Sequence, residues 1–363
     1  MSELGFGFLR LPKSDTGYDW PTLCRMTDLF LERGGRYFDT CYTYLDGNSE
    51  KGILDCLVRR HHRDSFLLAD KLPGYLCRSK ADAKTYFDES LRRCGVDYFD
   101  VYMLHWLNRE NLAFAERYDQ FGFLSGLKEK GLAGRIGFSY HDSAALLYEI
   151  LDRHPEVDVV QIQLNYLDWD AAGIEAGKCY DVCVRHGKSV IVMEPVKGGT
   201  LAALPEEAEA LLRSVHPDWS PSRWALNYVR SLSGVEIVLS GMSAPAQVEE
   251  NMSGAKDLSE EEEQILRKVS EVINKRTAVG CTGCAYCVSH CPQSIPIPDY
   301  FKMYNELQRY PQEGWKVRPV YDSLSRKHGK ASSCLGCGSC EEHCPQRLPV
   351  PKLMKAVAKA LEM

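Results

Sequence analysis

The chain has 363 residues, with 44 Lys or Arg and 50 Asp or Glu, so its formal net charge at pH 7 is -6. Charges of both signs are mixed along the chain, which argues against a nucleic-acid partner and against a polybasic membrane arm. No run of 18 or more apolar residues and no secretory signal pattern occurs, so we expect a cytoplasmic protein that does not enter the membrane. The length favours one large and one small domain.

Short apolar runs alternate with longer amphipathic runs up to about residue 275. The apolar runs, which we predict to be strands, are 5–9, 36–40, 66–72, 98–106, 136–140, 157–164, 189–196 and 235–240. The helices expected among them are 21–32, 49–60, 80–92, 116–130, 143–152, 174–186, 221–232 and 246–252. Eight strands, each returned by a helix over roughly 250 residues, predict an α/β fold, a closed (β/α)8 TIM barrel. An open dinucleotide-binding sheet is disfavoured because Gly5 and Gly7 lack the third glycine of that fingerprint.

Four polar residues lie at or just beyond the ends of early strand-like runs, namely Asp39, Tyr44, Lys71 and His105. The carboxyl ends of barrel strands form the active face of such folds. A free phenol titrates near pH 10, so Tyr44 becomes a useful acid only if an ammonium such as Lys71 stabilises its phenolate. Asp39 could balance a buried Lys71, and His105 could donate a hydrogen bond to a substrate oxygen. Each residue alone also fits an ordinary structural role, but their joint placement favours catalysis.

The sequence around these residues resembles the aldo-keto reductases. The similar segments are G-R-Y-F-D-T-C-Y-T-Y at 35–44, D-Y-F-D-V-Y-M-L-H-W at 97–106 and Gly-Phe-Ser at 137–139, and the resemblance spans most of residues 1–255. It implies reduction of a small carbonyl, or oxidation of an alcohol, with NAD(H) or NADP(H). It also implies that Tyr44 is the general acid, that Lys71 lowers the pKa of Tyr44, that Asp39 pairs with Lys71, and that His105 orients the carbonyl.

The same resemblance implies a nicotinamide site. The implied contacts are Ser139 and Gln161 for the carboxamide, Met193 or Glu194 beneath the ring, and Ser240, Gly241, Gln247 and Asn251 for the adenosine part. Met193 stands where the family often has an aromatic side chain, and Gly241 and Gln247 replace basic residues expected around a 2′-phosphate. Without such charges we expect weak NADPH discrimination or a preference for NADH. A strand end followed by a helix N-terminus would also account for the pattern at 240–251.

The composition becomes rich in Cys, Pro and Gly near residue 277, so we place the barrel at residues 1–276 and a second domain at 277–363. Residues 281–292 and 334–345 both read C-x2-C-x2-C-x3-C-P. In the bacterial ferredoxin pattern, three such thiolates hold one 4Fe-4S cluster and the fourth crosses to the partner cluster. We therefore predict two clusters, one on Cys281, Cys284, Cys287 and Cys344 and one on Cys334, Cys337, Cys340 and Cys291.

Zinc and disulfides fit these cysteine runs less well than iron-sulfur clusters do. Structural zinc usually uses two separated C-x2-C pairs, and disulfides suit small secreted domains. The remaining seven of the 15 cysteines have no pattern, and we expect them to be small buried apolar groups. Between and after the two runs we predict helices at 298–308, 320–327 and 351–363, which makes the second domain a mainly helical ferredoxin-like domain.

The two predicted halves differ in how they move electrons. A nicotinamide transfers two electrons as hydride and a cluster transfers one, so direct exchange needs a mediator such as a flavin, for which the sequence has no motif but which it does not exclude. The clusters could serve stability or docking, or could relay electrons from a ferredoxin or flavoprotein partner. A third interpretation makes the chain an electron-transfer subunit whose barrel is a scaffold, and the four catalytic candidates argue against it.

Overall fold

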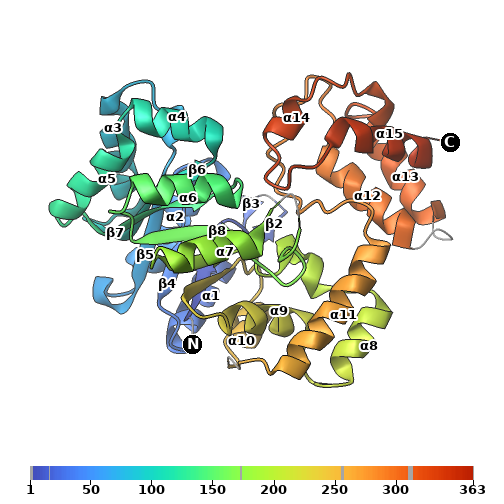
Figure 1. The fold of residues 1–363 in the computed structure, drawn as a ribbon, viewed down its shortest axis with the longest axis horizontal. Coiled ribbons are helices and arrows are strands. Elements are labelled where there is room, and N and C mark those ends of the chain that lie inside the picture. Colours follow the sequence, from blue (N-terminus) through green and yellow to red (C-terminus); the bar gives the residue numbers. More distant parts are fainter. Residues whose placement is uncertain (1–2, 16, 172–173, 255–256, 310–313, 363) are drawn as a thin grey trace. The chain divides into compact units, whose positions relative to one another are not determined.

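The polypeptide is described by a computed structural model that covers residues 3–15, 17–171, 174–254, 257–309 and 314–362. Eight parallel strands close into a barrel in the order β1, β10, β9, β8, β7, β6, β5, β4 (Figure 1). They are β1 (Glu3–Gly7), β4 (Tyr37–Asp39), β5 (Leu67–Leu72), β6 (Phe99–Leu107), β7 (Ala133–Tyr140), β8 (Val159–Gln163), β9 (Ser189–Met193) and β10 (Val235–Ser240). The closed barrel confirms the predicted fold class, and each predicted run overlaps one strand. The antiparallel pair β2 (Lys13–Ser14) and β3 (Gly17–Tyr18) was not predicted.

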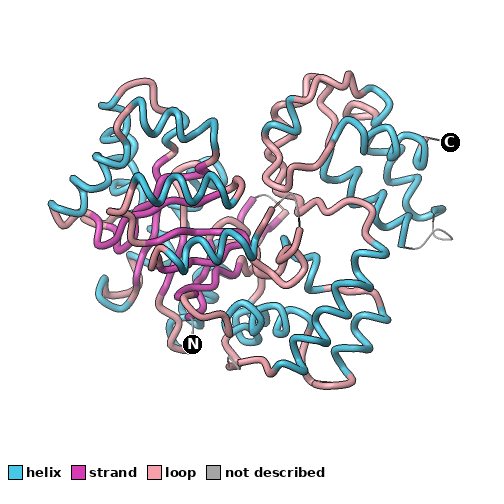
Figure 2. The backbone as a smooth tube through the Cα atoms, viewed as in Figure 1, coloured by secondary structure: helices cyan, strands magenta, loops and turns pink. Residues whose placement is uncertain are grey.

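Helices of the first unit surround the strands of the barrel (Figure 2). The helices of the first 251 residues, of which α8 belongs to the second unit, are α1 (Trp20–Glu32), α2 (Asn48–Ile53), α3 (Lys80–Cys94), α4 (Arg109–Arg117), α5 (Gln120–Glu129), α6 (Ala144–Arg153), α7 (Ala176–Arg185), α8 (Glu206–Arg213), α9 (Pro221–Arg230) and α10 (Pro245–Asn251). The helix expected at 116–130 is instead divided at Asp119, whose φ of 54° is left-handed, a conformation that aspartate tolerates better than most residues. The helix α8 was not predicted.

The barrel interior is filled with buried apolar side chains, which are Tyr37, Ala69, Val101, Met103, Val159, Ile191, Ile237 and Leu239. A glycine lets two strands approach closely beside this core. A Cβ at Gly137 would lie 2.0 Å from the carbonyl oxygen of Val159, so only glycine fits that position of β7. The resulting register places Ser139 directly beside Gln161.

The described chain divides into two compact units. The first comprises Met1–Asp170, Glu175–Pro195 and Ser222–Ser259, and the second comprises Ala171–Ile174, Val196–Pro221 and Glu260–Met363. The later helices all belong to the second unit and are α11 (Glu260–Arg276), α12 (Ile297–Arg309), α13 (Gly314–Ser325), α14 (Ser339–Glu342) and α15 (Val350–Leu361). In that unit α11 packs against α8, a grouping that the sequence did not indicate. The domain boundary after residue 276 stays a prediction.

The second unit has its own apolar core. Tyr300 and Phe301 of α12, Tyr321 of α13, and Met354 and Val357 of α15 are buried against one another. The helices predicted at 298–308 and 351–363 are present with small changes at their ends. The one predicted at 320–327 corresponds to α13, which begins earlier in the sequence.

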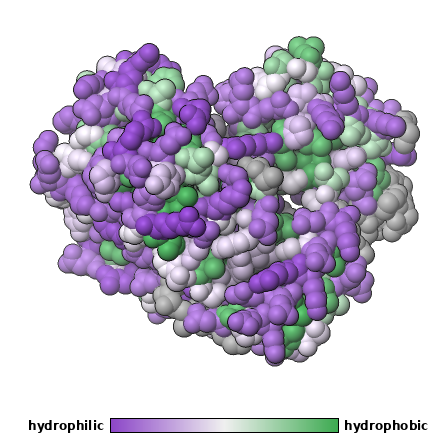
Figure 3. Space-filling view, viewed as in Figure 1, coloured by the Kyte–Doolittle hydropathy of each residue, from purple (hydrophilic) through white to green (hydrophobic). Residues whose placement is uncertain are grey.

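Two further expectations concern the cysteines outside the motifs and the membrane. Cys24 and Cys56 are joined in a disulfide, so the expectation that the seven scattered cysteines are simply small buried apolar groups is wrong for this pair. Their segments meet because α1 packs against the turn of π-helix at Leu54–Val58. Among the described residues, no helix is long and apolar enough to cross a membrane. The molecular face in Figure 3 is mostly hydrophilic, with hydrophobic residues in separate patches.

Candidate functional site

Strand alternation explains how polar residues come to face the inside of the barrel. Successive side chains of a strand point to opposite faces, so residues two apart share a face. The buried apolar residues Tyr37, Ala69 and Met103 are therefore followed two positions later by residues on the same face. Those residues are Asp39, Lys71 and His105.

Lys71 and Asp39 form a buried ion pair. Lys71 Nζ donates to Asp39 Oδ1 at 2.5 Å and to the carbonyl oxygen of Thr40 at 2.8 Å. The Lys71 side chain has no exposed surface, and that of Asp39 is 3% exposed. An unpaired charge in such a place would be costly, so each residue requires the other. The pairing that the sequence predicts for these two residues is present in the structure.

Tyr44 lies over this pair, but its pKa differs from the prediction. Lys71 Nζ is 5.0 Å from the centroid of the Tyr44 ring, and among the described residues no hydrogen bond joins it to the Tyr44 hydroxyl. Desolvation raises the pKa of Tyr44 well above 10, and the negative charge of Asp39 acts in the same direction. The expectation that Lys71 lowers this pKa does not hold in the structure, because desolvation, joined by the charge of Asp39, raises the pKa of Tyr44.

His105 completes the group of four. Its ring meets the Tyr44 ring edge to face at a centroid distance of 5.6 Å. Desolvation, with the positive charge of Lys71, lowers the pKa of His105 well below 6.5, so the imidazole is neutral at pH 7. His105 Nδ1 lies 3.3 Å from Cys41 Sγ and 3.5 Å from Thr43 Oγ1.

The contacts of His105 Nδ1 bear on which ring nitrogen carries the proton. Burial raises the pKa of the Cys41 thiol to about 12, so this group keeps its S–H, for which the Lys71 carbonyl oxygen at 3.8 Å and His105 Nδ1 at 3.3 Å are both acceptors within reach. A ring that accepts at Nδ1 carries its proton at Nε2. Cys41 was predicted to be a scattered apolar cysteine, and its position in the F-D-T-C-Y-T-Y segment was the signal that could have revealed this role.

Aromatic side chains near the four residues differ in where they point. Tyr75 lies 6.0 Å from the His105 ring and 5.7 Å from the Trp106 ring. Tyr42 instead donates from its hydroxyl to Glu89 at 2.8 Å, away from the catalytic candidates. Tyr75 and Trp106 are thus the aromatic residues that the structure places beside His105.

The implied nicotinamide contacts lie at the ends of β7, β8 and β9. Ser139 pairs with Gln161 across β7 and β8, and Gln163 pairs with Met193 across β8 and β9. Ser139 Oγ accepts from the backbone N–H of Trp106 at 2.7 Å. Gln161 is buried, and its Oε1 has no hydrogen-bond partner in the described chain. An orphaned buried acceptor is the kind of group that a carboxamide N–H would satisfy.

Glu194 comes directly after β9. Its φ of 59° is left-handed, and its carbonyl oxygen accepts from Asn165 Nδ2 at 3.1 Å. The turn at this residue redirects the chain at the carboxyl end of the strand. Non-glycine residues rarely adopt this conformation, and such positions cluster at functional sites.

The segment implied as the adenosine contact is held by internal hydrogen bonds. Ser240 Oγ accepts from Asn251 Nδ2 at 3.0 Å. Gln247 Oε1 accepts from the backbone N–H groups of Ser243 and Ala244 at 2.7 and 3.2 Å, which caps the start of α10. A strand end followed by a helix N-terminus therefore describes what Gln247 does in this structure.

A basic residue adjoins the same segment from a distant part of the sequence. A Cβ at Gly241 would lie 3.2 Å from Cδ of Arg10, so the Arg10 side chain passes directly over this glycine. The residues near 241 in the sequence give no sign of this cation, and it was not predicted. Arg10 follows β1, the neighbour of β10 in the barrel.

Four of the motif cysteines come together in one group of the second unit. Desolvation raises the pKa of Cys281 to about 11 and that of Cys287 to about 12. The neighbouring Cys284 and Cys344 act on both pKa values in the same direction. Cys344 comes from the second run and the other three from the first. Three sulfurs of one run thus lie near the fourth sulfur of the other.

The other four motif cysteines surround a cavity. Cys291, Cys334, Cys337 and Cys340 all line it. Desolvation raises the pKa of Cys340 to about 11, and the other three thiols act on it as near neighbours. Around a single zinc ion, sulfurs lie about 4 Å apart. Among the described residues, no three motif cysteines have their sulfurs all within 4.8 Å of one another.

Comparison with known proteins identifies both parts of the chain. The profile of the Aldo/keto reductase family matches residues 3–271. The chain belongs to the aldo/keto reductase family. Residues 280–348 match the 4Fe-4S dicluster domain, so the protein joins an oxidoreductase barrel to an iron-sulfur domain.

Individual relatives agree with this assignment. The NADH-specific methylglyoxal reductase of Escherichia coli (strain K12) is 27% identical over 298 residues, which cover 70% of this chain and 89% of the relative. The solved holo form of aldo-keto reductase AKR11C1 from Bacillus halodurans aligns with a TM-score of 0.61 at 27% identity, over 74% of this chain and 91% of that one. An aldo-keto reductase from Klebsiella pneumoniae in complex with NADPH has a TM-score of 0.60 at 20% identity, over 74% and 90% of the two chains, and so shares the fold.

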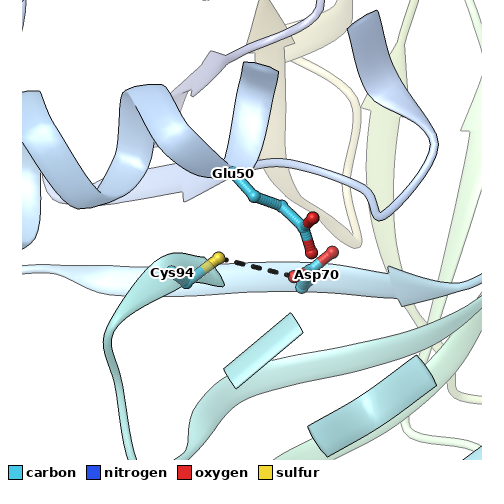
Figure 4. A group of neighbouring side chains, drawn as sticks. All are labelled: Glu50, Asp70 and Cys94. Carbon is cyan, nitrogen blue, oxygen red and sulfur yellow. Dashed lines mark hydrogen bonds between the residues drawn. The ribbon is translucent and has the colours of Figure 1, made fainter. Parts of the chain in front are cut away.

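A second buried polar cluster of this aldo/keto reductase lies on the other face of β5. The side chains of Asp70 and Lys71 lie on opposite faces of β5, because successive side chains of a strand alternate. Asp70 lies beside Glu50 and Cys94, and Cys94 Sγ donates to Asp70 at 3.7 Å (Figure 4). Desolvation and the neighbouring Glu50 raise the pKa of Asp70 well above its usual range. Arg93 Nη1 donates to Glu50 Oε2 at 2.9 Å. The positive charge of Arg93 offsets part of the negative charge of this cluster.

Proposed function

We propose that the barrel reduces a small carbonyl compound, or oxidises the corresponding alcohol, with a nicotinamide cofactor. The observation that carries this proposal is the convergence of the Asp39–Lys71 ion pair, Tyr44 and a neutral His105 on one inner face of the barrel. Side chains from three strands meet there, which is the arrangement of barrel active sites. A bound nicotinamide supplies hydride to the carbonyl carbon.

In this proposal Tyr44 gives a proton to the substrate oxygen. Its raised pKa keeps the phenol protonated at neutral pH, so the proton is present when the oxygen gains negative charge. Transfer requires the Lys71 ammonium to reach the phenol oxygen, and catalytic hydrogen bonds often form only with substrate bound. His105, with its proton on Nε2, donates to the same oxygen and stabilises the charge that develops on it.

Ser139, Gln161, Met193 and Glu194 are proposed to hold the nicotinamide. The buried, unpartnered Oε1 of Gln161 supports this role, because a carboxamide N–H would satisfy it. Met193 can cover one face of a flat ring, although less rigidly than an aromatic side chain.

The adenosine part is proposed to bind near Ser240, Gly241, Gln247 and Asn251, with Arg10 as the adjacent cation. The single guanidinium of Arg10 can contact a phosphate of either nucleotide without requiring the 2′-phosphate of NADPH. We therefore keep the expectation of weak NADPH discrimination or a preference for NADH. The name of the Escherichia coli relative, NADH-specific methylglyoxal reductase, supports the same direction. Tight NADPH binding with poor NADH binding would refute it.

The eight motif cysteines are proposed to ligate two 4Fe-4S clusters in the crossed pattern. The two groups of four sulfurs and the cavity lined by one of them support this number. Each cluster transfers one electron at a time, so the clusters serve either the stability of the second unit or exchange with a ferredoxin or flavoprotein partner. We place the protein in the cytoplasm, where thiolate ligands are kept reduced.

The test is an anaerobic assay of the full chain with NADH and NADPH against methylglyoxal and a panel of small aldehydes. Tyr44→Phe should lower kcat/KM by two or more orders of magnitude, since general-acid catalysis contributes about 10² to 10⁴. Tyr42→Phe is the matched control, because its hydroxyl bonds to Glu89 and it should keep near-full activity. Equal activity of the two variants would remove Tyr44 from the mechanism.

The role of the clusters is tested on the same sample by spectroscopy. Bleaching of the cluster absorbance by NADH would show that the barrel and the clusters exchange electrons. Bleaching only by dithionite or a reduced ferredoxin would assign the clusters to a partner reaction. A flavin would be seen directly in the visible spectrum.

A further inference from the structure

Lys197 is a buried cation in the second unit that the proposed reaction does not use. It is 5% exposed, although lysine is rarely buried. It begins the short helical segment Lys197–Ala202, which follows β9 in the sequence. Its φ of 46° is left-handed, and Gly198 and Gly199 continue the turn with φ of 62° and 99°. The backbone at Lys197 is thus in a sparsely populated conformation, and its side chain lies in the interior.

The ammonium of Lys197 points toward the first group of cysteines. Lys197 Nζ donates to Gln346 Oε1 at 3.3 Å, and Gln346 comes two residues after Cys344. The positive charge of Lys197 also acts on the Cys281 thiol, opposing the rise of its pKa caused by desolvation. Lys197 therefore acts on Cys281 of the first run and bonds to Gln346, which follows Cys344 of the second run, all within the second unit.

Two further polar atoms around this group have no partner in the described chain. Gln346 is 7% exposed and Thr282 is 6% exposed. Gln346 Nε2 and Thr282 Oγ1 both lack a hydrogen-bond partner. Buried donors without partners are costly, and both residues adjoin the cysteines in the sequence. Both atoms can donate to the sulfur atoms of a cluster bound by these cysteines.

The second group of cysteines has different surroundings. Its cavity is lined by apolar side chains, among them Ile295, Ile297 and Met354, together with His290 and Gln293, and no described Lys or Arg lines it. Cys337 of this group is exposed to solvent. Net charge, hydrogen bonds to sulfur and exposure set the reduction potential of a 4Fe-4S cluster. The buried cation distinguishes the first group from the second.

We propose that Lys197, oriented by Gln346, is a positioning residue that makes the cluster on Cys281, Cys284, Cys287 and Cys344 easier to reduce. This inference rests on the proposed binding of two clusters. Reduction adds one negative charge to a site already surrounded by thiolates, and a nearby buried ammonium stabilises the reduced state more than the oxidised state. The second cluster, without such a neighbour, should not depend on Lys197.

The test is a potentiometric titration of the full chain, purified anaerobically and followed by the electron paramagnetic resonance of the reduced clusters. Lys197→Met should lower the reduction potential of one cluster. Its reduction should become at least tenfold less favourable, which is about 59 mV for one electron. Lys197→Arg should restore most of the shift, since it keeps the charge. Lys355→Met removes an exposed charge from α15 of the same unit and should change neither potential.

The shifted signal should be the one that Cys284→Ala abolishes. Full iron in Lys197→Met with both potentials unchanged would overturn the inference while leaving the clusters in place. Wild-type protein without iron would instead refute the proposed binding of two clusters. Should Lys197→Met lose iron, Gln346→Met keeps the charge but removes its hydrogen-bond partner. In Gln346→Met, a lowered reduction potential of the same cluster, by less than the amount expected for Lys197→Met, would then support the inference. An unchanged potential would overturn it.

Discussion

In the barrel, the candidate catalytic residues come from separate strands, and the closed sheet alone brings Asp39, Lys71 and His105 together. In the second unit, each cysteine run supplies three sulfurs from seven consecutive residues, and the fold adds a fourth from the other run. The first site depends on long-range register and therefore on the stability of the whole barrel. The second depends on local spacing and on the meeting of two short segments. A substitution in one of these two regions should therefore leave the other region intact.

Removing the buried cation of the barrel should give the largest effect. Lys71→Met leaves Asp39 buried without its partner, and breaking such a pair costs about 3 to 5 kcal/mol of stability. Turnover should fall by orders of magnitude in the same variant. Denaturant unfolding and steady-state kinetics check both effects. Exposed Lys84→Met is the control, and equal stability of the two variants would contradict a paired, buried Lys71.

Removing one motif cysteine should affect the second unit and leave the barrel intact. Cys284→Ala should lose the iron of one cluster, about half of the total, because its sulfur belongs to the first group. Cys179→Ala, at a buried cysteine outside the runs, is the control and should keep all iron. Iron analysis of the two variants decides the point. Unchanged iron in Cys284→Ala would exclude it as a ligand.

The pH dependence of stability should report two histidines of the barrel whose pKa is lowered. Desolvation lowers the pKa of the half-buried His141 to about 4, and desolvation together with the charge of Lys71 lowers the pKa of His105 well below 6.5. Between pH 6.5 and 4 the unfolded chain therefore binds more protons than the folded one, and stability falls as pH falls. Each histidine contributes up to about 1.4 kcal/mol per pH unit.

The variant His141→Asn should weaken this fall, measured by denaturant unfolding at pH 7 and pH 5. His62, whose side chain is 82% exposed, provides the control through His62→Asn. A fall of stability as steep in His141→Asn as in the wild type would contradict the lowered pKa of His141.

The smallest effect is expected at Cys41. Cys41→Ala removes a donor to His105 Nδ1 and should lower kcat/KM by less than about tenfold, the value of one hydrogen bond. Cys41→Ser keeps a donor and should recover the loss. Nitrogen-15 spectra of the His105 ring should show the Nε2-protonated tautomer in the wild type and a mixture in Cys41→Ala. The same tautomer in both proteins would exclude Cys41 as its determinant.

The sequence predicted the features that repeat with a fixed period or spacing. Short apolar runs between longer amphipathic runs located all eight barrel strands, and the duplicated cysteine pattern grouped the sulfurs as the structure does. The Asp39–Lys71 pair was predictable because a buried lysine at a strand end needs a counter-charge.

Several features depend on tertiary contacts that no local pattern encodes. Arg10 reaches Gly241 across the closure of the barrel, and Cys24 meets Cys56 through helix packing. The pKa of Tyr44 was predicted in the wrong direction because the sequence could not show that desolvation, joined by the charge of Asp39, dominates. Lys197 escaped notice because its neighbours at Cys281 and Gln346 are far away in the sequence.

The most direct test of the catalytic proposal is a crystal structure of the full chain with a nicotinamide and a carbonyl inhibitor. The proposal predicts that the Tyr44 hydroxyl lies within about 3.2 Å of both the inhibitor oxygen and Lys71 Nζ, with His105 Nε2 donating to the same oxygen. A bound inhibitor whose oxygen faces other side chains, with Tyr44 turned away from Lys71, would contradict it.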